Sequence, residues 1–145
     1  MKSLNAKSMI VKWLSTIFAV ALLASCGGNN DTQVFLAFSA ALDGRQETPP
    51  NSSPGAGTGI VIVHPSDNTF TASVITSGIA ETDAHIHEGA PGISGPIVFP
   101  LTKESGTVIW RVSGTLSTAQ LATLKAGNYY FNVHSPTFPN GEIRG

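Results

Sequence analysis

Three of the four histidines in this chain fall in two short segments whose residues alternate as in β-strands. The segment AHIH (84–87) contains His85 and His87, and the segment NYYFNVH (128–134) ends on His134. Side chains two residues apart on a strand project from the same face, with Cα atoms ~6.8 Å apart. His85 and His87 are therefore expected to point together, away from the isoleucine between them.

The apolar residues of the second segment decide where His134 points. Tyr129, Phe131 and Val133 form its apolar face, so His134 lies on the other face. If the two strands are neighbours, the three imidazoles converge on one patch. Three imidazole ligands ~2.0 Å from a zinc or copper ion leave a fourth position open, as in catalytic and redox sites. The alternative is that these histidines are ordinary hydrogen-bonding groups beside glycine-rich loops.

Three charged residues accompany the histidines: Glu47, Glu142 and Arg144. Glu142 and Arg144 flank one residue, so both leave the core on the same side and come within reach of Glu47 or another carboxylate. We expect them to form an ion-pair network that pins the proline-rich loop 49–57. Glu47 has a second interpretation, as the acceptor for a histidine N–H that orients a metal ligand.

The sequence favours no class of enzyme. Asp83 precedes His85 by two residues, which permits a hydrolase interpretation, but no serine stands in a nucleophile motif. A phosphate-binding loop and a Rossmann fingerprint are also missing from the sequence. His64 stands before a proline at a strand end and is expected to be an exposed turn residue. A carbohydrate-stacking surface has only two aromatic candidates, Tyr130 and Phe138.

Seven segments with a two-residue period must position these side chains, which predicts an all-β domain. Clusters of Gly, Pro, Asn and Ser separate the segments, as in a β-sandwich or barrel. In the segment 116–127, Ser117 and Gln120 have the spacing of a capping box and Gly127 follows, so a short helix is expected there. The strand segments are 34–42, 58–64, 69–76, 84–87, 96–101, 107–113 and 128–134.

The first 25 residues have the features of a lipoprotein signal peptide. Three lysines and no acidic residue precede an apolar run at 13–23, which is too short to span the ~30 Å of a bilayer core. Cys26, the only cysteine, follows Leu-Ala-Ser in a pattern that resembles the bacterial lipobox. We expect cleavage before Cys26, lipidation of that residue, a flexible tether at 26–33 and a domain at 34–145. A glycine after the cysteine resembles lipoproteins sent to an outer membrane, where the organism has one.

Composition argues against a nucleic-acid binder. The chain has 145 residues, of which 12% are charged, and a formal net charge of −1. Removal of the signal peptide takes away three lysines and leaves five basic and nine acidic residues, a net charge of −4. Such a surface repels a phosphate backbone, because nucleic-acid affinity comes mainly from Lys and Arg. The length corresponds to about one domain.

Three longer motifs carry a resemblance to a known family. They are LDGRQETPP at 42–50, AHIHEGAPGISGPIVFPL at 84–101 and NYYFNVHSPTFPNGEIRG at 128–145. Together they resemble the CHRD domain, first described in chordin and found in bacterial secreted proteins, over residues 34–145. The resemblance implies an immunoglobulin-like β-sandwich without an agreed catalytic role. The stretch 85–89 is also similar to the His-x-His-Glu-x-Gly strand of copper–zinc superoxide dismutases, which have a Greek-key β fold.

These features together predict a lipid-anchored, extracytoplasmic CHRD module of the bacterial cell envelope that binds an envelope or extracellular ligand. Its contact with the membrane is through the lipid anchor. The alternative is a mononuclear copper or zinc protein that uses His85, His87 and His134 for metal storage or redox work. The similarity to superoxide dismutases supports one ion at most, because the chain has too few histidines for a bridged two-metal site.

Overall fold

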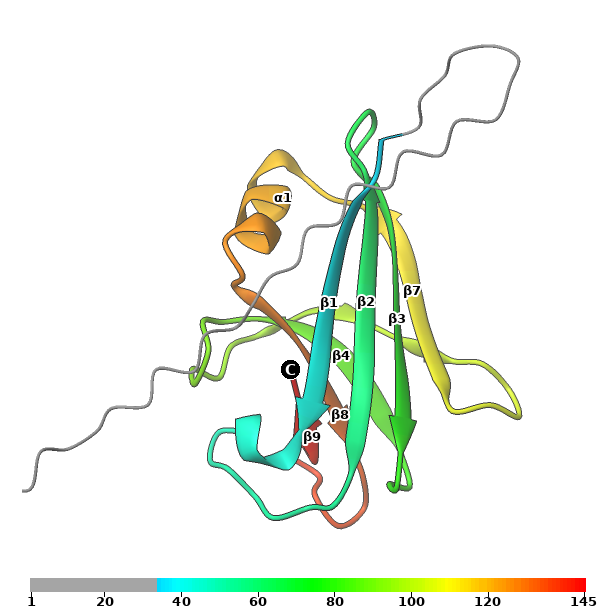
Figure 1. Cartoon of the computed structure of the whole chain (residues 1–145), viewed down its shortest axis with the longest axis vertical. Helices are drawn as coiled ribbons and strands as arrows, with labels where there is room; N and C mark the ends of the chain where they lie inside the picture. The colour runs from blue at the N-terminus through cyan, green and yellow to red at the C-terminus, as the bar shows by residue number, and fades with distance from the viewer. Residues whose placement is uncertain (1–33) are drawn as a thin grey trace, which may run out of the picture.

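The computed structural model describes residues 34–145, which form one strongly curved antiparallel sheet with a single α-helix (Figure 1). The all-β class and the short helix expected from the sequence are thereby confirmed. The predicted signal peptide, Cys26 and the tether at 26–33 lie outside the described residues. Within residues 34–145, no helix is long and apolar enough to cross a membrane.

Each of the seven predicted segments contains a strand. The strands are β1 (Leu36–Asp43), β2 (Ala56–His64), β3 (Thr69–Ser77), β4 (Asp83–Glu88), β5 (Ile97–Pro100), β6 (Thr102–Lys103), β7 (Ile109–Thr115), β8 (Tyr129–His134) and β9 (Ile143–Arg144). A 3₁₀ turn, η1 (Gly44–Gln46), follows β1, and the helix α1 (Thr118–Lys125) joins β7 to β8. The strands β6 and β9 were not predicted, because two residues are too few to show a period.

The order of the strands makes the sheet curl. They pair in the order β5-β4-β8-β9-β1-β2-β3-β7-β6, and every pair is antiparallel. The strands β5 and β6 lie at opposite ends of this order, yet only Leu101 separates them along the chain. The two ends of the sheet must therefore come close together, which gives a nearly closed sandwich or barrel.

The core fills the inside of this curled sheet. Alternate residues of the long strands are buried there, as the two-residue period predicts. The least exposed large side chains are Leu42, Val63, Val74, Val133 and Ile143. The helix α1 covers one open end with Leu121 and Leu124. It begins at the predicted capping box of Ser117 and Gln120, and Gly127 after it has a φ of 73°.

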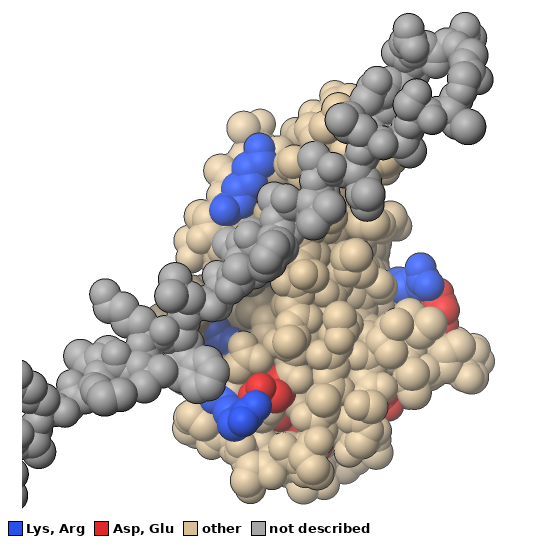
Figure 2. Space-filling model, in the orientation of Figure 1, with Lys and Arg blue, Asp and Glu red and all other residues tan. Residues whose placement is uncertain are grey.

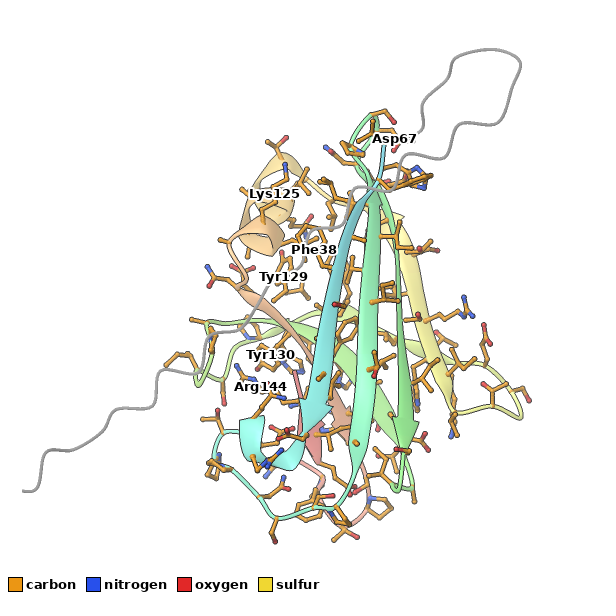
Figure 3. The ribbon with its side chains drawn as sticks, in the orientation of Figure 1. Phe38, Asp67, Lys125, Tyr129, Tyr130 and Arg144 are labelled. Atoms are coloured by element: carbon orange, nitrogen blue, oxygen red, sulfur yellow. The ribbon has the colours of Figure 1, made fainter. Side chains whose placement is uncertain are left out.

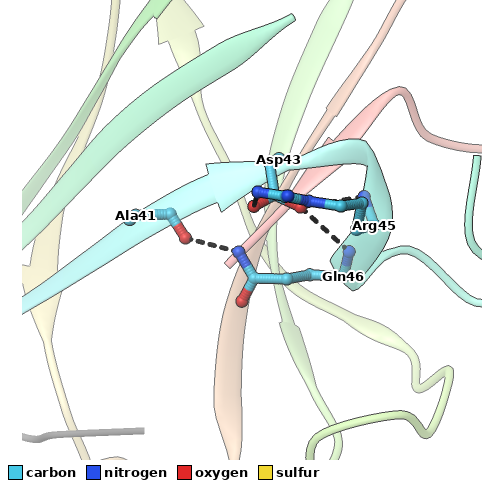
Figure 4. A network of polar contacts seen from close by, with 4 residues as sticks. All are labelled: Ala41, Asp43, Arg45 and Gln46. Carbon is cyan, nitrogen blue, oxygen red and sulfur yellow. Dashed lines mark hydrogen bonds and ion pairs between the residues drawn. The ribbon is translucent and has the colours of Figure 1, made fainter. Parts of the chain in front are cut away.

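The turn η1 is held by the carboxylate of Asp43 at the end of β1 (Figure 4). This carboxylate accepts the backbone N–H of Arg45 (2.8 Å) and of Gln46 (3.2 Å), and it pairs with the Arg45 guanidinium (3.1 Å). The side-chain bond from Arg45 is the largest of the causes that lower the pKa of Asp43. Charged side chains are otherwise few on the face seen in Figure 2, in line with the low charge content of the chain.

The short strand β9 joins the two halves of the sheet. Val133 of β8 pairs with Ile143, and Arg144 pairs with both Asn132 of β8 and Asp43 of β1. The side chain of Ile143 is fully buried. Two residues therefore connect β8 to β1.

Replacing Ile143 tests whether this short strand is structural. We expect Ile143→Ala to lower the free energy of unfolding by ~2–5 kcal/mol, because it leaves a cavity among fully buried neighbours. Urea denaturation followed by circular dichroism measures the loss. The control Ile93→Ala alters a side chain that is 59% exposed and should stay within ~0.5 kcal/mol of the wild type. Equal effects of the two substitutions would show that β9 contributes little.

Candidate metal centre

The three histidines lie on the outer face of the paired strands β4 and β8. On β4, Ala84 and Ile86 point into the core, so His85 and His87 point outward and are half-buried. On β8, Phe131 and Val133 point inward, and His134 lies on the same outer face as the β4 histidines. The structure therefore places all three histidines on the face that the alternation of residues predicts.

The register of β4 against β8 brings the rings together. His134 pairs with Asp83, so it lies diagonally opposite His85. The Nδ1 atom of His85 is 3.1 Å from the Nε2 atom of His134, and the ring centroids of His85 and His87 are 5.7 Å apart. One nitrogen from each of the three rings lies within 4.8 Å of the other two. Two nitrogens that are each ~2.0 Å from one ion lie at most about 4 Å apart, so a small movement of the rings would let this set share a single ion.

Two main-chain carbonyls orient two of the rings. The Nδ1 atom of His87 lies 2.9 Å from the carbonyl oxygen of Gly95, and that of His134 lies 3.0 Å from the carbonyl of Pro139. A carbonyl oxygen only accepts, so each Nδ1 carries the proton and each Nε2 keeps its lone pair. The Nε2 atom of His87 is buried and has no hydrogen-bond partner. A metal ion would supply the missing partner.

Burial favours the neutral form of His85 and His87. The pKa of His85 is lowered from its usual value of 6.5, first by desolvation and then by the neighbouring rings of His134 and His87. Desolvation is also the largest cause that lowers the pKa of His87. Arg144 adds a smaller effect in the same direction at His87. Neutral imidazole is the form that binds metal ions, so the environment favours the ligand form.

Tyr130 is buried between the ring of His87 and the guanidinium of Arg144. Its ring is stacked on His87 with centroids 5.0 Å apart and an angle of 13°, and the Cζ atom of Arg144 lies 3.4 Å from the Tyr130 ring centroid (Figure 3). Its hydroxyl accepts the N–H of Gly95 at 3.1 Å. Tyr130 was one of the two aromatic candidates for a carbohydrate-stacking surface, but only 8% of it is accessible. Phe138 is half-buried, so this pair forms no exposed aromatic surface.

Arg144 and Glu142 do not form the ion pairs that we expected. Arg144 donates to the carbonyls of Ala90 (3.1 Å) and Ile93 (2.8 Å) and to the Thr48 hydroxyl. No ion pair within residues 34–145 contains Arg144 or Glu142. Hydrogen bonds to neutral groups thus replace the predicted ion-pair network, because Arg144 is covered by loop 89–96 instead of standing at an exposed edge.

The proline-rich loop 49–57 is nevertheless held from the C-terminal segment. The Ser53 hydroxyl donates to the Glu142 carboxylate at 2.6 Å, and the Asn51 amide donates to the Glu142 carbonyl at 3.1 Å. Glu47 accepts from the Asn132 amide at 3.1 and 3.2 Å, so its carboxylate is not the acceptor of a histidine N–H. Burial raises the pKa of Glu47, which is 7% exposed. The orienting acceptors are main-chain carbonyls, which no sequence motif specifies.

The other two residues considered from the sequence, Asp83 and His64, take part in no catalytic arrangement among the described residues. Asp83 is exposed at the start of β4 and makes no hydrogen bond to His85 among the described residues. Within residues 34–145, no serine or threonine hydroxyl is hydrogen-bonded to a histidine, so the hydrolase interpretation has no nucleophile. His64 ends β2, where its ring meets Phe35 edge-on with centroids 4.7 Å apart. It is half-buried, not fully exposed as expected.

The three sequence motifs indicated a family, and comparison of the chain with known families tests that resemblance. The family model of the CHRD domain matches residues 38–145, which is well over half of the chain. The chain belongs to the CHRD domain family. The matched residues include every strand from β2 to β9 and all three clustered histidines. No curated protein and no solved structure matches this CHRD chain.

The lowered histidine pKa values predict how stability depends on pH. We expect the free energy of unfolding of the metal-free protein to fall as the pH drops below about 6.5, because the unfolded chain then binds protons that folded His85 and His87 exclude. This contribution is complete above the unfolded pKa and is lost as the pH falls toward the lowered folded pKa. Urea denaturation between about pH 7.5 and pH 5 measures it.

The matched comparison is the double variant His85→Gln/His87→Gln. It keeps Glu47, whose raised pKa acts in the opposite direction, so the difference between the two proteins isolates the histidines. The variant should lose less stability than the wild type over this range. If the free energy of unfolding changed with pH equally in both proteins, the lowered pKa values of His85 and His87 would be contradicted.

Proposed function

We propose that this CHRD protein is a lipid-anchored, extracytoplasmic module of the cell envelope that binds one copper or zinc ion through His85, His87 and His134. The single observation that carries the metal site is the gathering of three imidazole nitrogens within 4.8 Å on one outer face. Imidazole suits both copper and zinc. The buried, unpartnered Nε2 atom of His87 supports this assignment over that of histidines serving only as hydrogen-bonding groups.

Metal binding requires a small change at the other two rings. In the metal-free arrangement, His134 presents its Nε2 lone pair to His85, which donates a proton across the 3.1 Å contact. Binding of an ion between these atoms moves the His85 proton to its other nitrogen, and the hydrogen bond is lost. No net proton leaves a neutral ring in this step. His87 already presents a free nitrogen, so it is the natural first ligand.

Three ligands from the protein leave a coordination position for water or a small ligand. That open position suits either metal storage or redox exchange. The anchor is supported by the residues before the domain: a lysine-rich start, a short apolar run and Cys26 after Leu-Ala-Ser. Lipidation there would tether the domain through the few residues that precede β1.

Titration of the Cys26→Ala protein with Cu²⁺ and Zn²⁺ tests the metal site. We expect calorimetry to show one ion bound per chain. The ion that binds more tightly, Cu²⁺ or Zn²⁺, is the one that the site prefers. His85→Ala and His134→Ala each remove a ligand, so each should weaken binding at least by the roughly 10- to 100-fold that loss of an outer-shell partner costs. Binding should also weaken near pH ~6, as the imidazoles gain protons.

The control is His64→Ala, which removes a histidine that ends β2 and is not one of the three clustered residues. It should bind the ion as the wild type does. If either ligand variant kept wild-type affinity, the three-histidine site would be refuted and the protein would remain an envelope binding module.

Cell fractionation tests the anchor. The wild type should sediment with membranes, and Cys26→Ala should be released into the soluble fraction, because the acyl chains attach to that thiol. Ser25→Thr, which keeps Cys26, serves as the matched control and should stay membrane-bound. Equal membrane retention of Cys26→Ala would contradict lipid anchoring.

A further inference from the structure

Asn132 lies between Tyr130 and His134 on the outer face of β8, and it is 5% exposed. In the register of β4 against β8 it stands directly opposite His85, whereas His134 is only diagonal to that residue. Directly opposite residues on one face of a sheet have Cβ atoms ~4.5–5.5 Å apart. The side chain of Asn132 is therefore a close neighbour of the candidate ligand His85.

Hydrogen bonds fix which way the Asn132 amide points. Its Nδ2 atom donates to both carboxylate oxygens of Glu47, at 3.1 and 3.2 Å. The opposite orientation would place Oδ1 against the carboxylate, where both groups only accept. Glu47 follows the turn η1, which packs against β9, and β9 lies on the side of β8 opposite to β4. With Nδ2 toward Glu47, the Oδ1 atom points to the β4 side, where His85 lies.

This Oδ1 atom is buried and has no hydrogen-bond donor among the described residues. Gly141 packs directly on the amide, since a Cβ atom at that position would lie 2.7 Å from both Nδ2 and Oδ1 of Asn132. Glu47 and Gly141 together hold the amide, which leaves it little freedom to reach a donor elsewhere. A buried acceptor without a donor is costly, so it calls for a functional explanation.

Metal binding creates a donor on the residue opposite. In the metal-free arrangement, the Nδ1 atom of His85 carries the proton that it donates to His134 at 3.1 Å. When these two atoms bind an ion, Nδ1 gives it the lone pair, and the single ring proton of neutral His85 is then on Nε2. Metal-bound histidines almost always donate their other ring N–H to an acceptor, which orients the ring.

The three clustered rings differ in whether such an acceptor holds them. The carbonyls of Gly95 and Pro139 accept from His87 and His134. No carbonyl or carboxylate among the described residues holds the ring of His85, whose hydrogen-bond contact is with His134. The ring without an acceptor therefore stands opposite the acceptor without a donor.

We propose that Asn132 is a positioning residue of the metal site, whose Oδ1 atom accepts the Nε2–H of metal-bound His85. Glu47 acts through Asn132, because it holds the amide with Oδ1 toward β4. The buried carboxylate thus orients a metal ligand by way of an amide, without contact with the ring. This inference rests on the proposed three-histidine site and extends it.

Two double variants that share Glu47→Gln test this role in the Cys26→Ala protein. In Glu47→Gln/Asn132→Asp, the hydrogen bond is reversed: the new amide donates to the new carboxylate, whose second oxygen faces His85. In Glu47→Gln/Asn132→Leu, the side chain branches at the same carbon and has no acceptor. Calorimetric titration with Zn²⁺ should show affinity close to that of the parent for the first variant. The second should bind roughly 10- to 100-fold more weakly.

Nuclear magnetic resonance of the zinc form gives a readout that a merely structural role would not move. With ¹⁵N-labelled histidine, the parent should show His85 bound through Nδ1 and protonated at Nε2, with slow exchange of this proton with water. Glu47→Gln/Asn132→Leu should exchange it faster, because no acceptor remains. The structural control is Ser53→Ala, which removes a hydroxyl that donates to Glu142. It should keep the zinc affinity and the slow proton, even where thermal unfolding shows lower stability.

Failure of this inference is distinct from failure of the metal site. If the parent bound no Zn²⁺, both the metal site and the role of Asn132 would be refuted. If it bound one Zn²⁺ and the two double variants had equal affinity, the three-histidine site would stand and the role of Asn132 would be refuted. Zinc bound through Nε2 of His85 would also refute that role alone. The spectrum of the parent decides this last point even where a variant fails to fold.

Discussion

The antiparallel ladder between β4 and β8 is the constraint on which the candidate site depends. Its register runs from Asp83 opposite His134 to Glu88 opposite Tyr129. The register is fixed by side chains that both strands bury in one core. A slip of one residue would turn Ile86 outward and the histidines inward, so hydrophobic burial excludes it. The three clustered histidines are therefore positioned by the core, although none of them belongs to it.

How far the sequence predicted this site depends on how local each feature is. The face of each histidine followed from alternation within six residues, and that expectation agrees with the structure. The pairing of β4 with β8 had to be left as a condition, because 40 residues and three further strands separate them along the chain. Which strands become neighbours is a property of the whole topology, and short segments do not encode it singly.

Side-chain partners supplied by loops were harder still to foresee. The loop 89–96 folds back over the outer face, and it supplies the carbonyls that meet Arg144 and His87. Its Gly-Pro-rich sequence indicated turns but not their direction. Tyr130 was a candidate for an exposed carbohydrate-stacking surface, but it is buried, and Gly95 of this loop bonds to its hydroxyl. The same loop explains why Arg144 has carbonyl partners, since Ala90 and Ile93 supply them while the Tyr130 ring lies under the guanidinium.

The two outermost strands of the sheet, β5 and β6, are short, and this has a consequence that does not concern the histidine site. β5 has four residues and ends on Pro100, and β6 has two and ends on Lys103. Proline cannot donate to an incoming strand, and a lysine resists burial against one. Because the chain passes from one strand to the other through Leu101, each border is also close to its counterpart. Neighbouring copies of such a domain would find little at these borders to template edge-to-edge aggregation.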